Sequence, residues 1–367
     1  MAPAFDESYN FIEIRDCVPH SGTRVVFGRW RMLGLAKRVG FLATAAIVAA
    51  GCGSVSSGAG VSAPTIQIKY STQWGPTFPA VRADQYFADQ INKQSNGRIK
   101  VTIYLNGQLG GAPGTVTGVE NGTIQMGVVA TSWLSSISPH APALSTPFLF
   151  KDEASAERAL KGPAGALIGT EAENYGHVLL TSWYPTGFGQ FSTTTHPINS
   201  LADMRGLKMR VLNDPTEIAS YKAWGAIPLP LNNTEVFAAL QSGTAQGVGI
   251  PISAMMNDKY GEVVKYISVG NVEYFASVVM INAAFFNSLP SDLQQLLMKV
   301  GAEAGAKEAG FVANADADAT KTAESMGIKV NQIPDSALGD FKSALSGVYA
   351  NANQKYGAGF MQNLSNS

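Results

Sequence analysis

Alternating apolar and polar residues mark short strands along the chain, and segments with helical spacing separate them. Ile66–Ser71 alternates with a period of two, which is typical of a strand. Ala80–Ser95 follows, with its apolar residues gathered on one face of an amphipathic helix, and Arg98–Leu105 alternates again. A strand, a helix and a second strand in this order predict a parallel sheet of the α/β class.

The same patterns continue toward the C-terminus. Further strands are predicted at Met126–Ala130, His177–Trp183, Gln246–Pro251 and Val272–Ile281, and further helices at Val116–Asn121, Glu153–Leu160, Thr216–Trp224 and Thr234–Ser242. A longer helical run begins near Ser291 and continues to about Ser325. Small residues recur along this run at helical spacing and form one face, which comprises Ala302, Ala306, Ala309 and Ala313.

One predicted strand carries a candidate binding residue near its end. Leu207–Leu212 alternates, so that Arg210 shares a side with Lys208, and Asn213-Asp214-Pro215 ends the strand. In open α/β sheets ligands bind beyond the carboxyl ends of the strands. A guanidinium there offers a rigid fork of donors that fits a carboxylate. The spacing alone also fits a surface salt bridge or a structural arginine, because most arginines are structural or solvated.

The composition allows a large core and gives no sign of a polyanionic partner. The chain has 367 residues, of which 46% are hydrophobic, and this is enough for two lobes. The formal net charge is −1, so no basic surface indicates binding to nucleic acid.

The N-terminal segment has the features of a signal peptide. Lys37 and Arg38 precede the mostly apolar run Val39–Gly51, which is too short to span a bilayer comfortably. The run ends in A-A-G-C, which resembles a bacterial lipobox with cleavage before Cys52 and lipid on its sulfur. An ordinary signal peptide cut near Ala63, or a buried thiol at position 52, are the alternatives.

The remaining expectations for this segment concern its boundaries. Residues 1–31 fit no signal-peptide plan, so we expect residues 1–51 to be an overlong N-terminus plus a lipoprotein signal peptide, with the true start at Met32. Residues 52–64 are expected to form a linker. Removal of residues 1–51 also removes Cys17, which leaves only Cys52, so neither an internal disulfide nor a cysteine metal site is expected.

Six short segments follow one another in a recognisable order. They read N-G-R-I-K-V-T-I-Y (Asn96–Tyr104), G-Q-L-G-G (Gly107–Gly111), E-N-G-T-I-Q-M-G-V-V (Glu120–Val129), N-S-L-A-D-M-R-G-L-K-M-R-V (Asn199–Val211), T-E-V-F-A-A-L-Q-S-G (Thr234–Gly243) and F-F-N-S-L-P-S-D-L-Q (Phe285–Gln294). Together they resemble the substrate-binding proteins of TRAP transporters, the tripartite ATP-independent periplasmic uptake systems (DctP-like). Each segment alone is weak, whereas six in order identify the family from about Ile66 to the C-terminus.

The resemblance implies a fold and a set of partners. The expected fold is an α/β, two-lobed periplasmic-binding-protein architecture with a hinge and a long C-terminal helix that spans both lobes. We expect lobe I to comprise residues 65–187 and 276–315, and lobe II residues 188–275 and 316–367. The resemblance further implies an extracytoplasmic protein that delivers a small carboxylate to TRAP permease subunits. With the lipobox at Cys52, we expect a monomer that is lipid-anchored to the cell membrane and has no cofactor and no metal.

The resemblance also implies the site residues. The arginine that pairs with the ligand carboxylate falls on Arg210, and a neighbouring family asparagine falls on Asn213. Other family positions are occupied differently in this chain: Gln190 stands where a second arginine is usual, and Ile250 where an asparagine contacts the ligand. Asn233 replaces an aromatic residue.

Aromatic residues stand at two further positions of the expected pocket. Trp133 occupies a position that is often polar or charged in the family, and Gln73-Trp74 stands where small or polar residues are common. Unpaired buried polar groups of a ligand cost about 1–3 kcal/mol each, so this less charged pocket predicts a monocarboxylate with an apolar or aromatic body. Core packing is the alternative role of each aromatic residue.

No catalytic set is visible in the sequence. The four histidines are scattered without metal-binding spacing, and neither G-x-S-x-G nor G-x-x-x-x-G-K-[ST] occurs. We therefore expect a binding protein for uptake rather than an enzyme. The alternatives are a ligand-sensing binding protein for a signalling receptor and, less favoured, an exported hydrolase.

Overall fold

A computed structural model describes residues 64–366 of the chain. The expectations for Cys52, for the signal peptide and for most of the linker fall on residues 1–63 and lie outside the described range. Within the described range, nine strands form one sheet. The strands are β1 (Ile66–Thr72), β2 (Ile99–Tyr104), β3 (Met126–Ala130), β4 (Val178–Thr193), β5 (Lys208–Val211), β6 (Ile227–Pro230), β7 (Gly247–Ile250), β8 (Tyr266–Asn282) and β9 (Lys329–Gln332).

Helices surround this sheet. They are α1 (Pro79–Gln94), α2 (Gly111–Glu120), α3 (Glu153–Lys161), α4 (Pro163–Gly176), α5 (Pro215–Ala223), α6 (Asn233–Ser242), α7 (Ile252–Asn257), α8 (Ala283–Ser288), α9 (Ser291–Ser325), α10 (Asp335–Ala344), α11 (Ser346–Tyr356) and α12 (Ala358–Ser365), with short 3-10 turns at Thr131–Ser136, Ala141–Ser145, Leu201–Met204 and Tyr260–Glu262. None of the described helices combines the length and the apolar composition that crossing a bilayer requires.

The sheet joins two groups of parallel strands through two long antiparallel ones. Its order is β2-β1-β3-β8-β4-β7-β5-β6, with β9 also paired to β8. Strands β2, β1 and β3 run parallel to one another, as do β6, β5 and β7, which confirms the parallel pairing predicted from the strand-helix-strand pattern. Strands β4 and β8 pair antiparallel with each other and with β7 and β3. Strands β8 and β4 therefore lie between the two parallel groups.

The long strands differ from their predicted bounds. The sequence pattern ended the first at Trp183 and began the second at Val272, whereas β4 continues to Thr193 and β8 begins at Tyr266. The β4–β8 register shifts between Pro185 and Gly187 and again between Gly189 and Phe191. Two glycines in Gly187-Phe188-Gly189 are unfavourable within a strand, so the sequence pattern alone suggests that β4 ends before them. In the structure these residues still pair with β8 and the strand continues. The lobe boundary at residue 187 lies among these shifts and stays a prediction.

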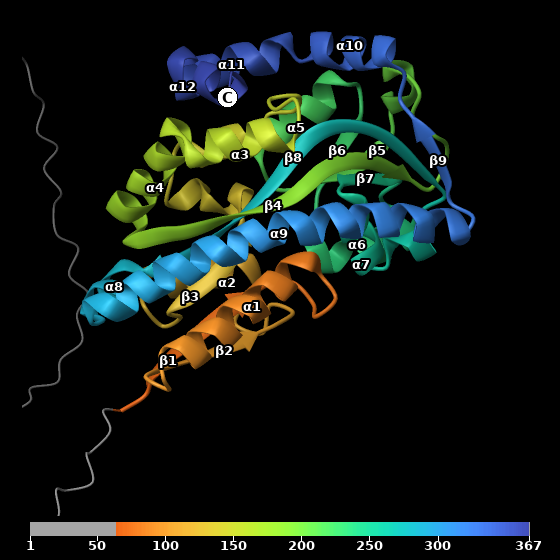
Figure 1. Cartoon of the computed structure of the whole chain (residues 1–367). Helices are drawn as coiled ribbons and strands as arrows, with labels where there is room; N and C mark the ends of the chain where they lie inside the picture. The colour runs from red at the N-terminus through yellow and green to blue at the C-terminus, as the bar shows by residue number, and fades with distance from the viewer. Residues whose placement is uncertain (1–63, 367) are drawn as a thin grey trace, which may run out of the picture. The chain divides into compact units, whose positions relative to one another are not determined.

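The long C-terminal helix is confirmed as α9. It runs alongside β4 (Figure 1) and also packs on α1, α7 and β9. Because α1 connects β1 to β2 and α7 follows β7, α9 contacts helices that belong to both parallel groups. The small-residue face noted in the sequence is not the face that packs, because Ala302, Ala306 and Ala313 are exposed. The buried row instead includes Leu297, Val300, Ala304, Glu308 and Val312. Gly305 allows this row to approach β4, since a Cβ at this position would lie 2.9 Å from the carbonyl oxygen of Trp183.

Candidate functional site

A cavity of about 510 Å³ lies where loops follow the parallel strands. The residues that line it are Gln73, Trp74, Phe78, Asn106, Gly107, Gly110, Gly111, Ala112, Pro113, Ala130, Trp133, Thr186, Arg210, Leu212, Asn232, Asn233, Thr234, Ile250, Pro251, Ala254, Asp258, Phe275, Ala276 and Ser277. Most of them follow the carboxyl ends of β1, β2, β3, β5, β6 and β7, and the remainder come from the middle of β4 and β8. This is the edge at which α/β sheets bind ligands.

Arg210 is the only cationic side chain of the described chain that lines the cavity. It lies on β5 between Leu229 of β6 and Val248 of β7, and it is 3% exposed. Its Nε donates to the carbonyl oxygen of Leu231 at 3.1 Å. Within residues 64–366 the guanidinium makes no other hydrogen bond and no ion pair with an acidic residue. Its two terminal nitrogens can therefore serve a ligand.

Two buried acidic side chains lie at the start of α5, shortly after Arg210 in the chain. Asp214 caps α5 and accepts hydrogen bonds from the backbone of Thr216 and Glu217 at 2.7 and 3.0 Å. Glu217 accepts a hydrogen bond from the backbone of Leu212 at 2.8 Å. Burial raises the pKa of Glu217 to about 7, although the nearby charge of Arg210 opposes this rise. Glu217 is therefore a poor neutralising partner for the arginine near pH 7.

The structure gives a physical reason for the glycine at position 249. A Cβ at Gly249 would lie 1.9 Å from the hydroxyl oxygen of Tyr221, which is 1% exposed. The tyrosine thus fills the space that a longer side chain at position 249 would need. An acidic side chain at position 249 would collide with Tyr221.

Six of the predicted site residues line the cavity, namely Gln73, Trp74, Trp133, Arg210, Asn233 and Ile250. Trp74 stacks on Phe78 with ring centroids 4.8 Å apart and an interplanar angle of 8°. The stacked pair adds apolar aromatic surface to the cavity at the start of α1. The structure also assigns core packing to Tyr184, which is 1% exposed and does not line the cavity.

Gln190 and Asn213 do not line this cavity. Gln190 donates to the carbonyl oxygen of Phe188 at 3.0 Å and to Oδ1 of Asn271 at 2.7 Å, and its own Oε1 accepts from the backbone of Gly270 and Asn271. The Gln190 amide is thus used in hydrogen bonds that link β4 to β8. Asn213 is exposed beyond the end of β5. Ligand contacts for these two residues stay predictions, and the present geometry does not favour them.

Several cavity residues were not identified from the sequence. Phe78, Asn106, Leu212, Asn232 and Pro251 stand beside predicted residues or in loops after predicted strands, so their position at strand ends was a usable signal. Thr186 and Phe275–Ser277 gave no such signal, because the central parts of β4 and β8 were not recognised as one continuous pairing. Asp258 was also missed.

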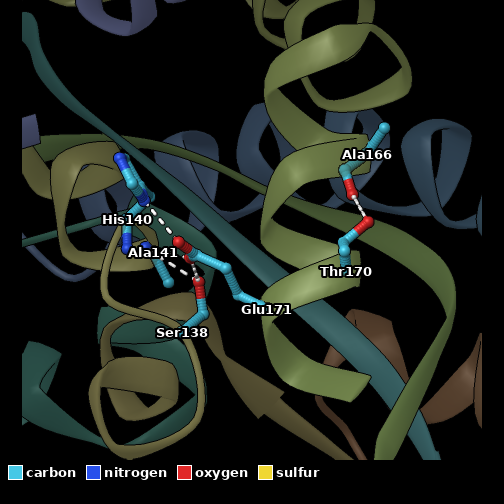
Figure 2. Close-up of polar contacts among 6 residues, drawn as sticks. All are labelled: Ser138, His140, Ala141, Ala166, Thr170 and Glu171. Carbon is cyan, nitrogen blue, oxygen red and sulfur yellow. Dashed lines mark hydrogen bonds and ion pairs between the residues drawn. The ribbon is translucent and has the colours of Figure 1, made fainter. Parts of the chain in front are cut away.

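A second polar cluster lies away from the cavity and ties a loop to α4. Ser138 Oγ donates to Oε2 of Glu171 at 2.6 Å, the backbone of His140 donates to the same oxygen at 3.1 Å, and the His140 ring bonds to Oε1 (Figure 2). Burial alone would raise the pKa of Glu171, but these bonds outweigh it and the pKa lies below its usual value. The serine donates to the carboxylate and not to the imidazole, so no Ser–His nucleophile pair forms.

Comparisons with known proteins agree on one family. The family model of bacterial extracellular solute-binding protein family 7 (DctP) matches residues 70–355. The 2,3-diketo-L-gulonate-binding periplasmic protein YiaO of Escherichia coli (strain K12) is 32% identical over 231 residues, which are 63% of this chain and 70% of that protein.

Two solved structures show the same fold. The sugar acid binding protein DctPAm of Advenella mimigardefordensis, in complex with galactonate, gives a TM-score of 0.79 at 24% identity and covers 82% of this chain and 97% of its own. A TRAP periplasmic solute binding protein from Desulfovibrio salexigens, with bound orotic acid, gives 0.76 at 23% identity and covers 82% and 96%. The two-lobed α/β fold class predicted from the sequence is thereby confirmed.

Proposed function

Because the chain belongs to bacterial extracellular solute-binding protein family 7, the solute-binding proteins of TRAP transporters, we propose that it captures its solute by pairing Arg210 with a carboxylate. Proteins of this family are non-enzymatic, extracytoplasmic components that bind organic acids and deliver them to membrane permease subunits. One observation carries the proposal for Arg210: a buried guanidinium faces the cavity with its two terminal nitrogens free of hydrogen bonds to the described residues.

Electrostatics favour an anionic partner at this position. A buried charge without a partner costs several kcal/mol, on the order of 3–5, and a carboxylate can remove this cost by accepting two parallel N–H donors. The bond from Nε to Leu231 leaves the terminal nitrogens to form such a pair and fixes the plane of the guanidinium. The neighbouring Glu217 is partly protonated near neutral pH, so it competes weakly.

The cavity lining supports a monocarboxylate with an apolar or aromatic body. A second carboxylate on the ligand would find no second cationic side chain among the described lining residues. Trp74 and Phe78 form a stacked aromatic pair that lines the cavity, and Trp133 and Phe275 add further aromatic surface. A carboxylate is the group common to diketogulonate, galactonate and orotic acid, the ligands named for the similar proteins, and orotic acid also has a flat ring.

Calorimetry on two variants tests the role of Arg210. The titrants are D-galactonate, 2,3-diketo-L-gulonate, succinate, orotate and phenylacetate. We expect Arg210→Ala to weaken every acid that binds by about 2–5 kcal/mol, because the carboxylate loses its charged partner. Arg210→Lys keeps the charge but not the fork, so it should recover only part of the loss. Arg205→Ala, at an exposed arginine five residues earlier, is the matched control and should leave affinity unchanged.

The same titrations separate the two parts of the proposal. Unchanged affinity in Arg210→Ala would contradict the anchoring role. Binding of only sugar acids or of succinate by the wild type would reject the apolar or aromatic body and leave the anchoring role intact. If the solute has an apolar or aromatic body, orotate or phenylacetate should bind more tightly than galactonate and succinate.

A further inference from the structure

An acidic side chain lines the same cavity at some distance in sequence from Arg210. Asp258 directly follows α7 and is partly buried. Within residues 64–366 its carboxylate forms no ion pair with a lysine, arginine or histidine. Asp258 is also the only acidic residue of the described chain that lines this cavity, as Arg210 is its only cationic one.

Two amide groups hold the Asp258 carboxylate. Nδ2 of Asn233 donates to its Oδ2 at 2.9 Å, and Nδ2 of Asn257 donates to its Oδ1 at 3.0 Å. Each carboxylate oxygen thus accepts one N–H donor from the protein. An ionised carboxylate has about four acceptor sites, so roughly two remain for a ligand.

Hydroxyl groups fix the direction of both amides. The Tyr260 hydroxyl donates to Asn233, with Oδ1 at 3.1 Å and the backbone carbonyl oxygen at 3.2 Å, and Oγ1 of Thr77 donates to Oδ1 of Asn257 at 2.5 Å. With each amide oxygen already accepting a bond, each amide nitrogen is directed to Asp258. Thr77 belongs to the loop between β1 and α1, so this network joins two elements that both line the cavity. The carboxylate is oriented by the protein itself, which lowers the cost of ordering it when a ligand binds.

The charges of Arg210 and Asp258 both influence the pKa of Tyr260. Burial raises the pKa of the Tyr260 hydroxyl first, and the negative charge of Asp258 raises it further, whereas the positive charge of Arg210 lowers it. A single buried hydroxyl therefore lies within electrostatic reach of both charged groups. One small molecule of modest length can contact both.

We propose that Asp258 is a second anchoring point, which accepts a hydrogen bond from a hydroxyl or ammonium group on the acid that Arg210 holds. The solute class is then a monocarboxylate with a compact, largely apolar body and one donor group away from its carboxylate. This inference rests on the proposed function of the cavity and deepens it. An acid without a hydroxyl or ammonium group cannot donate a hydrogen bond to Asp258. It should therefore bind less tightly by the free energy of that hydrogen bond.

Matched pairs of acids test this assignment by calorimetry. The pairs are phenylacetate with 3- and 4-hydroxyphenylacetate, and 3- and 4-methylbenzoate with the corresponding (aminomethyl)benzoates. In the wild type we expect the best donor-bearing acid to bind about tenfold more tightly, or better, than its parent. In Asp258→Ala that preference should fall to within about twofold, while the affinity for the parent acids stays near the wild-type value.

Two variants distinguish the donor groups and control for folding. Asp258→Asn keeps the shape and one acceptor oxygen but removes the charge, so it should retain most of a preference for a hydroxyl and lose a preference for an ammonium group. Asp318→Ala removes an exposed acid that does not line the cavity and should change neither preference. Thermal unfolding of each variant establishes that it is folded before titration.

Two results would overturn the assignment of Asp258. One is a donor preference that survives in Asp258→Ala, and the other is wild-type protein that binds the parent acids as tightly as the donor-bearing ones. Failure of the underlying function gives a different result, because Arg210→Ala would then bind all of these acids as the wild type does. The two failures are therefore separate observations.

Discussion

Arg210 on β5 and Gln190 on β4 both flank β7 in the sheet but differ in what their polar atoms contact. The Gln190 amide makes four hydrogen bonds, all to β4 or to the Gly270-Asn271 turn of β8. Arg210 makes one, and the rest of its guanidinium faces the cavity. Hydrogen bonding thus separates a residue that stabilises the sheet from one that is available to a solute.

Substitution of Gln190 tests this distinction. Gln190→Ala leaves two backbone N–H groups and Oδ1 of Asn271 without their partner, so we expect the free energy of unfolding to fall by about 1–3 kcal/mol. Affinity for acids should change little if the residue has no ligand contact. Chemical denaturation and calorimetry measure the two quantities, and Gln94→Ala, at an exposed glutamine on α1, serves as the control. A loss of affinity without a loss of stability would restore the original prediction.

The sequence predicted cavity residues where a local motif marks them. Arg210 stands at the end of a short strand within a recognisable segment, and Trp74 and Trp133 follow the first and third strands. The position of Gln190 depends on bonds to residues about 80 positions later, and Asp258 depends on Asn233, 25 positions earlier. A single sequence carries no local signal for such long-range pairs.

Helices α1 and α9 meet around two buried acids. Glu308 is fully buried with neither carboxyl oxygen hydrogen-bonded, and Asp84 uses only Oδ1, which accepts from the Tyr70 hydroxyl at 2.6 Å. Burial raises the pKa of Glu308 to about 9 and that of Asp84 to about 8. Both groups are therefore neutral in the folded protein near pH 7.

These pKa values predict that stability falls as the pH rises. The ordinary pKa values are 4.5 for Glu308 and 3.8 for Asp84, so between about pH 5 and 9 the folded state binds more protons than the unfolded state. The stabilisation present below pH 4 is thus lost as the pH approaches the folded-state values. We expect Glu308→Gln to be more stable than the wild type at pH 9 by roughly 2–4 kcal/mol, with little difference at pH 5.

Denaturation curves at a series of pH values measure this effect. Glu324→Gln, an exposed position on the same helix, is the matched control and should follow the wild type at every pH. A Glu308→Gln variant whose stability ran parallel to that of the wild type from pH 5 to 9 would show that Glu308 is ionised in the folded protein.

At the scale of elements, periodicity predicted β1, β2, β3, β5 and β7 of the parallel groups and the full extent of α9. It did not identify α4 or β9, and it did not show which face of α9 packs. Alanines recur on the exposed face of this helix, whereas the packing face includes Gly305, which fits against the β4 backbone. That contact is a property of the assembled pair of elements and not of the helix pattern.

The whole molecule is expected to act at a membrane surface. Family members are extracytoplasmic, and we propose that a lipid on Cys52, outside the described residues, holds this one at the cell membrane. Several acyl chains hold a protein on a bilayer far more firmly than one. Cys52→Ser in the full chain should therefore move the protein from the membrane fraction to the soluble fraction, as fractionation and immunoblotting would show. Cys17→Ser is the control, and a membrane-bound Cys52→Ser variant would contradict the anchor.

Movement of two lobes around the solute is also a whole-molecule property. The predicted lobe boundaries assign residues 65–187 to lobe I and residues 188–275 to lobe II, with β4 and β8 connecting the two lobes. A solute can stabilise a closed form only if it contacts both sides better in that form than in the open one. Arg210 and Asp258 on one side and Trp74 and Trp133 on the other provide such contacts in the described cavity.

The most direct test of the central claim is a crystal structure of the protein with the tightest-binding acid from the calorimetric screen. We expect both carboxylate oxygens of the acid to accept hydrogen bonds from the terminal nitrogens of Arg210, at about 2.7–2.9 Å. A solute carboxylate bound elsewhere in the cavity, with Arg210 paired instead to Glu217, would contradict the account.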